Sequence, residues 1–234
     1  MLSFFSSRGF SQAQGVWQSD KYQELPYRIL MPDHYDPNKM YPLVLFLHGI
    51  GERGTDNQIQ LSNGAELFNN LDYRARYPAI VVVPQCPLGA WWTGFPYRIN
   101  KIPRPGFLAA SLVKTLVQTL SVDPKRVYVT GLSMGAYAVW DFIVRYNDLF
   151  AAALPVSGAG DIATARQLTT TPIWAFHNLG DFLINPVYDR QMYVELESRN
   201  GLMKYTEYPV WGHDAWTKTF QNTEVLDWLF LQKR

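Results

Sequence analysis

Residues 126–146, RVYVTGLSMGAYAVWDFIVRY, constrain the fold of this chain more than any other stretch. The stretch opens with an alternating apolar run typical of a short buried strand, and it closes with apolar residues at helical spacing. Between the two lies the pentapeptide GLSMG at 131–135. A strand that turns this abruptly into a helix needs small residues two positions before and after the apex, because larger side chains would collide. The pattern predicts a nucleophile elbow, with the Ser133 hydroxyl held clear of the sheet above a helix N-terminus.

The chain resembles the α/β-hydrolases, and within them the esterase branch described as polyhydroxybutyrate-depolymerase-like or predicted-peptidase-like, which includes feruloyl esterases. The resemblance extends from about residue 25 to the C-terminus. It implies a mostly parallel central sheet flanked by helices on both faces, without a large lid domain. The segments that carry it are LHGIGERG at 47–54, PQCP at 84–87, GLSMG at 131–135, WD at 140–141 and HDAW at 213–216.

The 234 residues suit one domain of this kind, and we expect the catalytic domain to occupy residues 25–234. Residues 1–24 are expected to form an N-terminal segment with an edge region. Within it, SQAQ at 11–14 resembles the small-residue end of a bacterial export signal, although the apolar patch before it is too short for a signal-peptide core. One hypothesis is that Met1 lies within a longer precursor. The expected protein is soluble, and its compartment is left open between the cytoplasm and export.

Charge and ligand chemistry narrow the expected partners. The formal net charge is +1 and no run of Lys and Arg is present, which argues against nucleic acid and anionic membranes. No apolar run reaches transmembrane length. Cys86 is the only cysteine, so neither an intrachain disulfide nor a cysteine-based zinc site is possible. We therefore expect no metal and no cofactor, and an ester substrate that is either a small molecule or linked to a polysaccharide. The oligomeric state is not readable from the sequence.

Apolar periodicity and turn residues predict the other elements. Helices are expected at 107–120, after Ser133 and at 220–230, and helical segments within 56–70. Residues 94–105 are expected to form an irregular loop on the active-site side. Strands are expected at 25–31, 43–47, 79–83, 127–129, 151–156, 172–177 and 204–208.

The loop after the strand at 43–47 reads HGIG at 48–51. Glycines there let the backbone approach a ligand closely. In an α/β-hydrolase this position is the oxyanion-hole loop, so the resemblance implies that the backbone N–H groups of Ile50 and Met134 form the oxyanion hole. It also implies that the His48 ring braces the loop.

A serine nucleophile needs a base, and the base needs a carboxylate to orient it. In this fold the chain order is Ser, then acid, then His. His34 and His48 precede Ser133, and His177 has no suitably placed acid before it. The prediction for the base is therefore His213, on a loop between the last predicted strand and the last predicted helix.

The acid is expected to follow the strand at 172–177. Asp181 matches the acid position of the family, four residues after the strand-end His177, although Asn178 stands where the family usually has glycine. That departure predicts a loop of different shape. Asp161 is the reserve candidate, and Asp189, inside the next helix, is the third.

Trp91 and Trp92 have two readings of about equal weight. They either pack in the core or form an aromatic wall for an acyl or phenolic group. The function expected is a serine carboxylesterase that hydrolyses short-chain, feruloyl or acetyl esters through an acyl-enzyme. The alternatives are a serine peptidase of the same fold and, more remotely, a non-catalytic binding protein.

Overall fold

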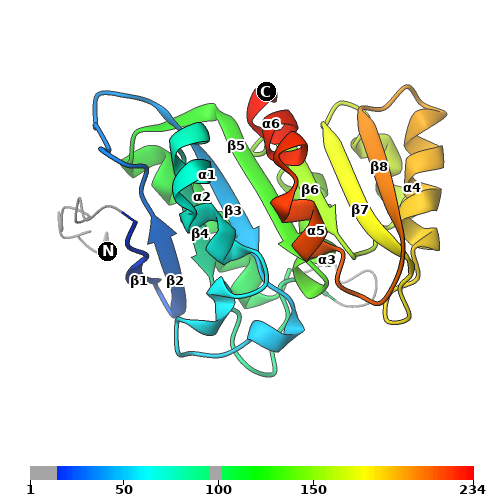
Figure 1. The fold of residues 1–234 in the computed structure, drawn as a ribbon, viewed down its shortest axis with the longest axis horizontal. Coiled ribbons are helices and arrows are strands. Elements are labelled where there is room, and N and C mark those ends of the chain that lie inside the picture. Colours follow the sequence, from blue (N-terminus) through cyan, green and yellow to red (C-terminus); the bar gives the residue numbers. More distant parts are fainter. Residues whose placement is uncertain (1–14, 95–101) are drawn as a thin grey trace.

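The computed structural model describes residues 15–94 and 102–234, and an eight-stranded sheet runs through it (Figure 1). The strand order is β1-β2-β4-β3-β5-β6-β7-β8. Strands β1 and β2 are antiparallel to their neighbours, whereas β4, β3 and β5 to β8 run parallel. The strands are β1 Gln18–Tyr22, β2 Leu25–Leu30, β3 Tyr41–Leu47, β4 Ile80–Pro84, β5 Val122–Leu132, β6 Ala152–Val156, β7 Ile173–Gly180 and β8 Met203–Trp211.

Helices cover both faces of the sheet, which confirms the predicted α/β-hydrolase class. The α-helices are α1 Leu71–Arg76, α2 Arg104–Thr119, α3 Met134–Arg145, α4 Val187–Glu197, α5 Trp216–Gln221 and α6 Thr223–Leu231. Side chains of α2, α3 and α4 join one hydrophobic cluster, and those of α5 and α6 join a second. Figure 1 shows α1, α5 and α6 in front of the sheet. The described residues also include four short 3₁₀ segments, which are η1 Ile50–Glu52, η2 Ile59–Leu61, η3 Ala65–Asn69 and η4 Ile162–Gln167.

The central strand β3 shows why the sequence folds this way. All seven of its residues are buried, as expected for a strand covered on both faces. Leu43, Leu45 and Leu47 join the first cluster, while Val44 and Phe46 join the second. Strand β3 runs parallel to its neighbour β5, and Leu47 lies opposite Gly131, so the carboxyl ends of the two strands lie side by side. Ligands bind outside the carboxyl ends of the strands in open α/β folds.

Several elements have other bounds than predicted, and β5 begins at Val122 where a turn was expected before residue 127. Strand β1 pairs with β2 from Gln18↔Ile29 to Tyr22↔Leu25, so the sheet begins before residue 25. The last predicted helix is two helices, because Asn222 ends α5 and its side chain accepts from the Glu224 N–H at the start of α6. The SQAQ motif at 11–14 and most of the predicted loop at 94–105 lie outside the described residues. Within the described part of the chain, no helix combines the length and apolarity needed to cross a bilayer.

Candidate active site

Ser133 sits at the sharp turn between β5 and α3 with φ 51° and ψ −116°. A residue with a side chain adopts this left-handed region only at a cost of about 1–3 kcal/mol. The turn also brings the flanking glycines against the end of β3. A Cβ on Gly135 would lie 1.9 Å from the Leu47 carbonyl oxygen, and one on Gly131 would lie 2.5 Å from it. The spacing of the motif follows from this contact, since no larger residue fits at either position.

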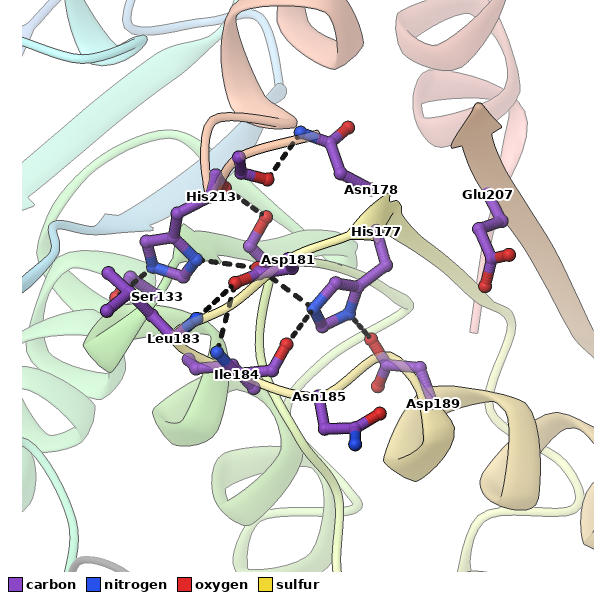
Figure 2. A network of polar contacts seen from close by, with 12 residues as sticks. Ser133, His177, Asn178, Asp181, Leu183, Ile184, Asn185, Asp189, Glu207 and His213 are labelled. Carbon is purple, nitrogen blue, oxygen red and sulfur yellow. Dashed lines mark hydrogen bonds and ion pairs between the residues drawn. The ribbon is translucent and has the colours of Figure 1, made fainter. Parts of the chain in front are cut away.

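The His213 ring comes from the loop between β8 and α5 and faces Ser133 (Figure 2). The distance from Ser133 Oγ to His213 Nε2 is 2.9 Å, which allows the hydroxyl to donate to the imidazole. Two side chains hold the loop. The Ser157 hydroxyl donates to the His213 carbonyl at 2.8 Å, and the Asn178 amide donates to the Gly212 carbonyl at 2.9 Å. The residue that departs from the family pattern thus fixes the loop that carries His213.

Asp181 lies on the far side of the same ring. Its Oδ2 accepts from His213 Nδ1 at 2.6 Å, and its Oδ1 accepts from the backbone N–H groups of Leu183 and Ile184 at 2.9 and 3.0 Å. Burial raises the pKa of this carboxyl, but the hydrogen bonds from His177 and His213 outweigh burial and hold the pKa well below its usual range. Asp181 is therefore ionised at neutral pH.

The other two candidate acids lie elsewhere. The Asp161 side chain accepts from the Ala163 N–H at the start of η4, which makes it a helix cap. Asp189 is fully buried in α4, and its Oδ2 lies 2.8 Å from His177 Nδ1. The structure therefore brings Asp181, and neither of the alternatives, into hydrogen-bond contact with His213.

Chain order excludes His177 as the base, and no other role was predicted for this residue. The structure places this buried ring between Asp181 and Asp189 (Figure 2). Its Nε2 lies 3.1 Å from Asp181 Oδ2 and 3.0 Å from the Ile184 carbonyl oxygen. The only signal in the sequence is the placement of a histidine at a strand end four residues before the acid.

The HGIG loop runs against the elbow. A Cβ on Gly49 would lie 3.6 Å from Ser133 Cβ and 2.8 Å from Leu132 Cδ1. Ile50 is the first residue of η1 and Met134 is the first residue of α3. Backbone N–H groups at helix starts have no partner within their helix and are free for a ligand. The oxyanion-hole assignment of Ile50 and Met134 stays a prediction that this arrangement supports.

The His48 side chain links the HGIG loop to the segment after β4 through two hydrogen bonds. The Cys86 N–H donates to His48 Nε2 at 2.9 Å, so the ring's own proton is on Nδ1, which donates to the Gly49 carbonyl at 2.6 Å. Burial lowers the pKa of His48 to about 4, and the ring is neutral at physiological pH. The neighbouring Cys86 thiol is buried too, and burial raises its pKa to about 12, so it is not a nucleophile.

The two tryptophans have different environments. Trp92 is fully buried and its Nε1–H donates to the His48 carbonyl at 3.1 Å. The prediction that Trp92 forms part of a substrate-binding wall is wrong, because a ring packed in the core does not face a substrate. Trp91 is half-buried, with the Arg53 guanidinium 5.4 Å from its ring centroid. Its role in substrate binding stays a prediction. Within residues 15–94 and 102–234, no group of three or more His, Cys, Asp and Glu side chains is arranged to hold a metal ion.

The sheet, the elbow and the Ser133, His213 and Asp181 contacts define an α/β-hydrolase. Residues 22–222 match the family described as "Putative esterase", and the chain belongs to that family.

The most informative structural match is a thermostable esterase, 35% identical, with a TM-score of 0.86 over 94% of this chain and 63% of that one. A feruloyl esterase module from Clostridium thermocellum, in complex with sinapinate, shares the fold at 18% identity, with a TM-score of 0.68 over 93% of this chain and 88% of that one.

Curated relatives are longer proteins. Poly(3-hydroxyalkanoate) depolymerase C of Paucimonas lemoignei is 31% identical over 136 residues, which are 55% of this chain and 30% of the relative. Probable feruloyl esterase C of Aspergillus terreus is 27% identical over 132 residues, which are 56% of this chain and 46% of the relative. The chain thus spans less than half the length of either protein.

Proposed function

We propose that this protein is a serine carboxylesterase in which Ser133 is the nucleophile, His213 the general base and Asp181 the orienting acid. The observation that carries the proposal is the unbroken path from Ser133 Oγ through His213 to Asp181, with contacts of 2.9 and 2.6 Å. Membership of the esterase family supports ester hydrolysis as the reaction. The strained elbow supports Ser133 as nucleophile, because strain of this kind persists where function requires it.

In the first half-reaction, Ser133 Oγ attacks the ester carbonyl carbon while His213 Nε2 takes the hydroxyl proton. The ring then carries a positive charge, which the ionised Asp181 stabilises at His213 Nδ1. The carbonyl oxygen becomes an oxyanion, and the backbone N–H groups of Ile50 and Met134 are the proposed donors to it. Each donor of this type contributes about 3 kcal/mol to lowering the barrier.

The tetrahedral intermediate collapses when its bond to the leaving alcohol breaks and His213 Nε2 gives its proton to the alcohol oxygen. The acyl group is left on Ser133 Oγ. In the second half-reaction His213 removes a proton from water, and the hydroxide attacks the same carbonyl carbon. The bond to Ser133 Oγ then breaks, the proton returns to Ser133, and the carboxylic acid leaves.

The proposed substrates are carboxylic esters with short-chain, acetyl or feruloyl acyl groups, including groups linked to polysaccharides. The names of the matched relatives, a polyhydroxyalkanoate depolymerase and a probable feruloyl esterase, support this range. Trp91 is the proposed aromatic contact for an aryl group, since its ring is half-buried and its neighbour Arg53 belongs to the loop after β3.

The test compares the protein with its Ser133→Ala variant on p-nitrophenyl acetate, p-nitrophenyl butyrate, methyl ferulate and an amide matched to one of the esters. We expect turnover of the esters, a loss on the order of 10⁴- to 10⁶-fold in kcat for the variant, and an unchanged far-UV CD spectrum. A fluorophosphonate should label Ser133 in the unmodified protein only. Ester turnover that survives in Ser133→Ala would refute the assignment. Faster turnover of the amide would identify a peptidase, and an absence of labelling would favour a binding protein.

A further inference from the structure

Behind the triad acid lies a second histidine–carboxylate pair that the proposed ester hydrolysis does not use. His177 lies within β7 and Asp189 belongs to α4, and the side chains of both are fully buried. Figure 2 shows the continuous path that they extend, from Ser133 through His213, Asp181 and His177 to Asp189. A buried ionisable pair is costly to build, so its position against Asp181 calls for an explanation.

The acceptors around the His177 ring determine where its protons lie. Nε2 faces two groups that only accept, the ionised Asp181 Oδ2 at 3.1 Å and the Ile184 carbonyl at 3.0 Å. Nε2 therefore carries a proton. Nδ1 faces Asp189 Oδ2 at 2.8 Å, and one further proton lies in that contact. Whichever atom holds this proton, His177 and Asp189 together have no net charge.

The pKa directions agree with this proton count. Burial lowers the pKa of His177, but its hydrogen bonds to Asp181 and Asp189 outweigh burial and raise it to about 9. Burial raises the pKa of Asp189 as well. Both directions keep the shared proton on the pair at neutral pH. The Trp140 indole acts on the same carboxylate and lowers the pKa of Asp189, although neither Trp140 Nε1 nor Asp189 Oδ1 has a hydrogen-bond partner among the described residues.

Asp181 is the negatively charged group that contacts His213, and the nearby carboxylate of Glu207 has partners of its own. On β8, Glu207 is paired with Arg190 of α4 through two contacts of 2.7 and 2.8 Å. Tyr205 donates to the same Glu207 carboxylate at 2.7 Å. The ionisable and charged groups near the pair are thus Asp181, His213, Tyr205, Glu207 and Arg190.

We propose that His177 and Asp189 are a positioning pair for the triad acid, an inference that rests on the proposed esterase function. The His177 Nε2–H fixes the Asp181 oxygen that also accepts from His213, and Asp189 keeps the His177 ring in the orientation that presents this proton. Two backbone N–H groups already fix Asp181 Oδ1, so the His177 bond completes the orientation of the carboxylate. The bond also divides the negative charge of Asp181 Oδ2 between two donors, so that less of it is directed at His213.

The decisive comparison is between two double variants, His177→Gln/Asp189→Asn and His177→Met/Asp189→Asn. Gln and Met have nearly the same length and flexibility, but only Gln has an N–H to donate to Asp181. Both variants remove the ionisable pair together, so neither leaves a lone buried charge. Each is measured for thermal unfolding, for the fraction of protein labelled by a fluorophosphonate, and for kcat and KM on p-nitrophenyl acetate across pH.

We expect the Gln variant to keep kcat within a few-fold of the unmodified protein, with the same acid limb of kcat/KM. The Met variant should lose about tenfold to a hundredfold in kcat with little change in KM, because the carboxylate is no longer held in place. Its acid limb should move to higher pH, because Asp181 Oδ2 then acts on His213 alone. A purely structural role would lower the thermal stability of both variants without moving the limb of either.

Two results would overturn the inference: a folded and labelled Met variant with unchanged kcat and pH profile, or equal losses in both variants. NMR of ¹⁵N-labelled protein separates this failure from failure of the esterase proposal, because it needs no turnover. The imidazole N–H signal of His213 should shift in the Met variant and stay in place in the Gln variant. If the unmodified protein hydrolyses no ester but the NMR result holds, the proposed reaction is wrong and the positioning contact stands. An unshifted signal in the Met variant would count against the contact itself.

Discussion

The Gly135 α-carbon packs directly against the Leu47 carbonyl, and a Cβ there would lie 1.9 Å from the carbonyl oxygen. This contact joins the start of the elbow helix to the end of β3, the strand that leads into the HGIG loop. The nucleophile and the proposed oxyanion-hole loop are therefore held at a fixed separation by backbone atoms. Substitutions at this junction test the geometry of the site without touching a triad side chain.

Replacing Gly135 with Ala should destabilise the protein by about 3 kcal/mol, because the new methyl group meets a backbone oxygen that cannot move alone. The measurement is urea unfolding followed by CD. Gly51→Ala is the matched control, since a Cβ on Gly51 has nothing within 4 Å, and it should change stability by less than about 1 kcal/mol. Equal stabilities of the two variants would show that the elbow does not pack as described.

A substitution that relieves the backbone strain at Ser133 should make the protein more stable. Ser133→Gly and Ser133→Ala both remove the hydroxyl, but only glycine adopts φ 51° and ψ −116° at no steric cost. We expect the glycine variant to be more stable than the alanine variant by about 1 kcal/mol, since part of the relieved strain is offset by the greater freedom of glycine in the unfolded chain. Thermal unfolding of the two inactive variants measures this directly. A more stable alanine variant would mean that the turn is not strained.

The neutral, buried His48 predicts a loss of stability in acid. Its pKa is about 4 in the folded protein and 6.5 when exposed, so between these values the unfolded chain binds a proton that the folded protein does not. The contribution is fully present above pH 6.5 and is lost as the pH falls to 4, by about 3 kcal/mol in total. His48→Gln does not titrate, so its stability deficit relative to the unmodified protein should shrink over that interval. Urea titrations at pH 7.5, 6 and 5 test this, and a constant deficit would contradict it.

Local patterns were sufficient to predict the three residues that the structure brings into hydrogen-bond contact. Ser133 follows from short-range sterics, His213 follows from the chain order that the fold allows, and Asp181 follows from its match to the acid position of the family. The His177–Asp189 contact was not predictable in this way, because it depends on how α4 packs against β7, and the position of His177 four residues before the acid does not identify its partner. Trp92 differs from Trp91 for a similar reason: burial of one ring depends on the path of the chain beneath the HGIG loop.

Strand β1 shows another limit. Its residues are mostly polar and exposed, so hydrophobic periodicity gives no indication of it. Only its pairing with β2 makes it a strand. Edge elements of this kind are invisible to pattern analysis, whereas β3, with every residue buried, is the easiest element to predict.

Asn178 predicts an effect on the loop that carries His213. Asn178→Ala removes the amide that donates to the Gly212 carbonyl at 2.9 Å. We expect a fall in kcat of about tenfold, because His213 is less well held, and little change in KM. Stability should change by less than about 1 kcal/mol, since the buried Asn178 Oδ1 has no partner among the described residues and is removed too. Ser157→Ala, which removes the hydrogen bond to the His213 carbonyl, is the companion variant. An unchanged kcat in both variants would show that the loop keeps its conformation without these two side chains.

The position of Trp91 leads to a prediction about which acyl groups the protein prefers. If its ring contacts the aryl part of a substrate, Trp91→Ala should lower kcat/KM for methyl ferulate by about three- to tenfold, the usual size of an aromatic pair contact. The value for p-nitrophenyl acetate monitors the rest of the site, and it should fall far less, because an acetyl group has no ring to contact. Trp92→Phe is the control for damage to the loop: it removes the 3.1 Å bond to the His48 carbonyl and should affect both substrates alike. Equal losses on both substrates in Trp91→Ala would remove Trp91 from the acyl pocket, and the feruloyl hypothesis would lose its main structural support.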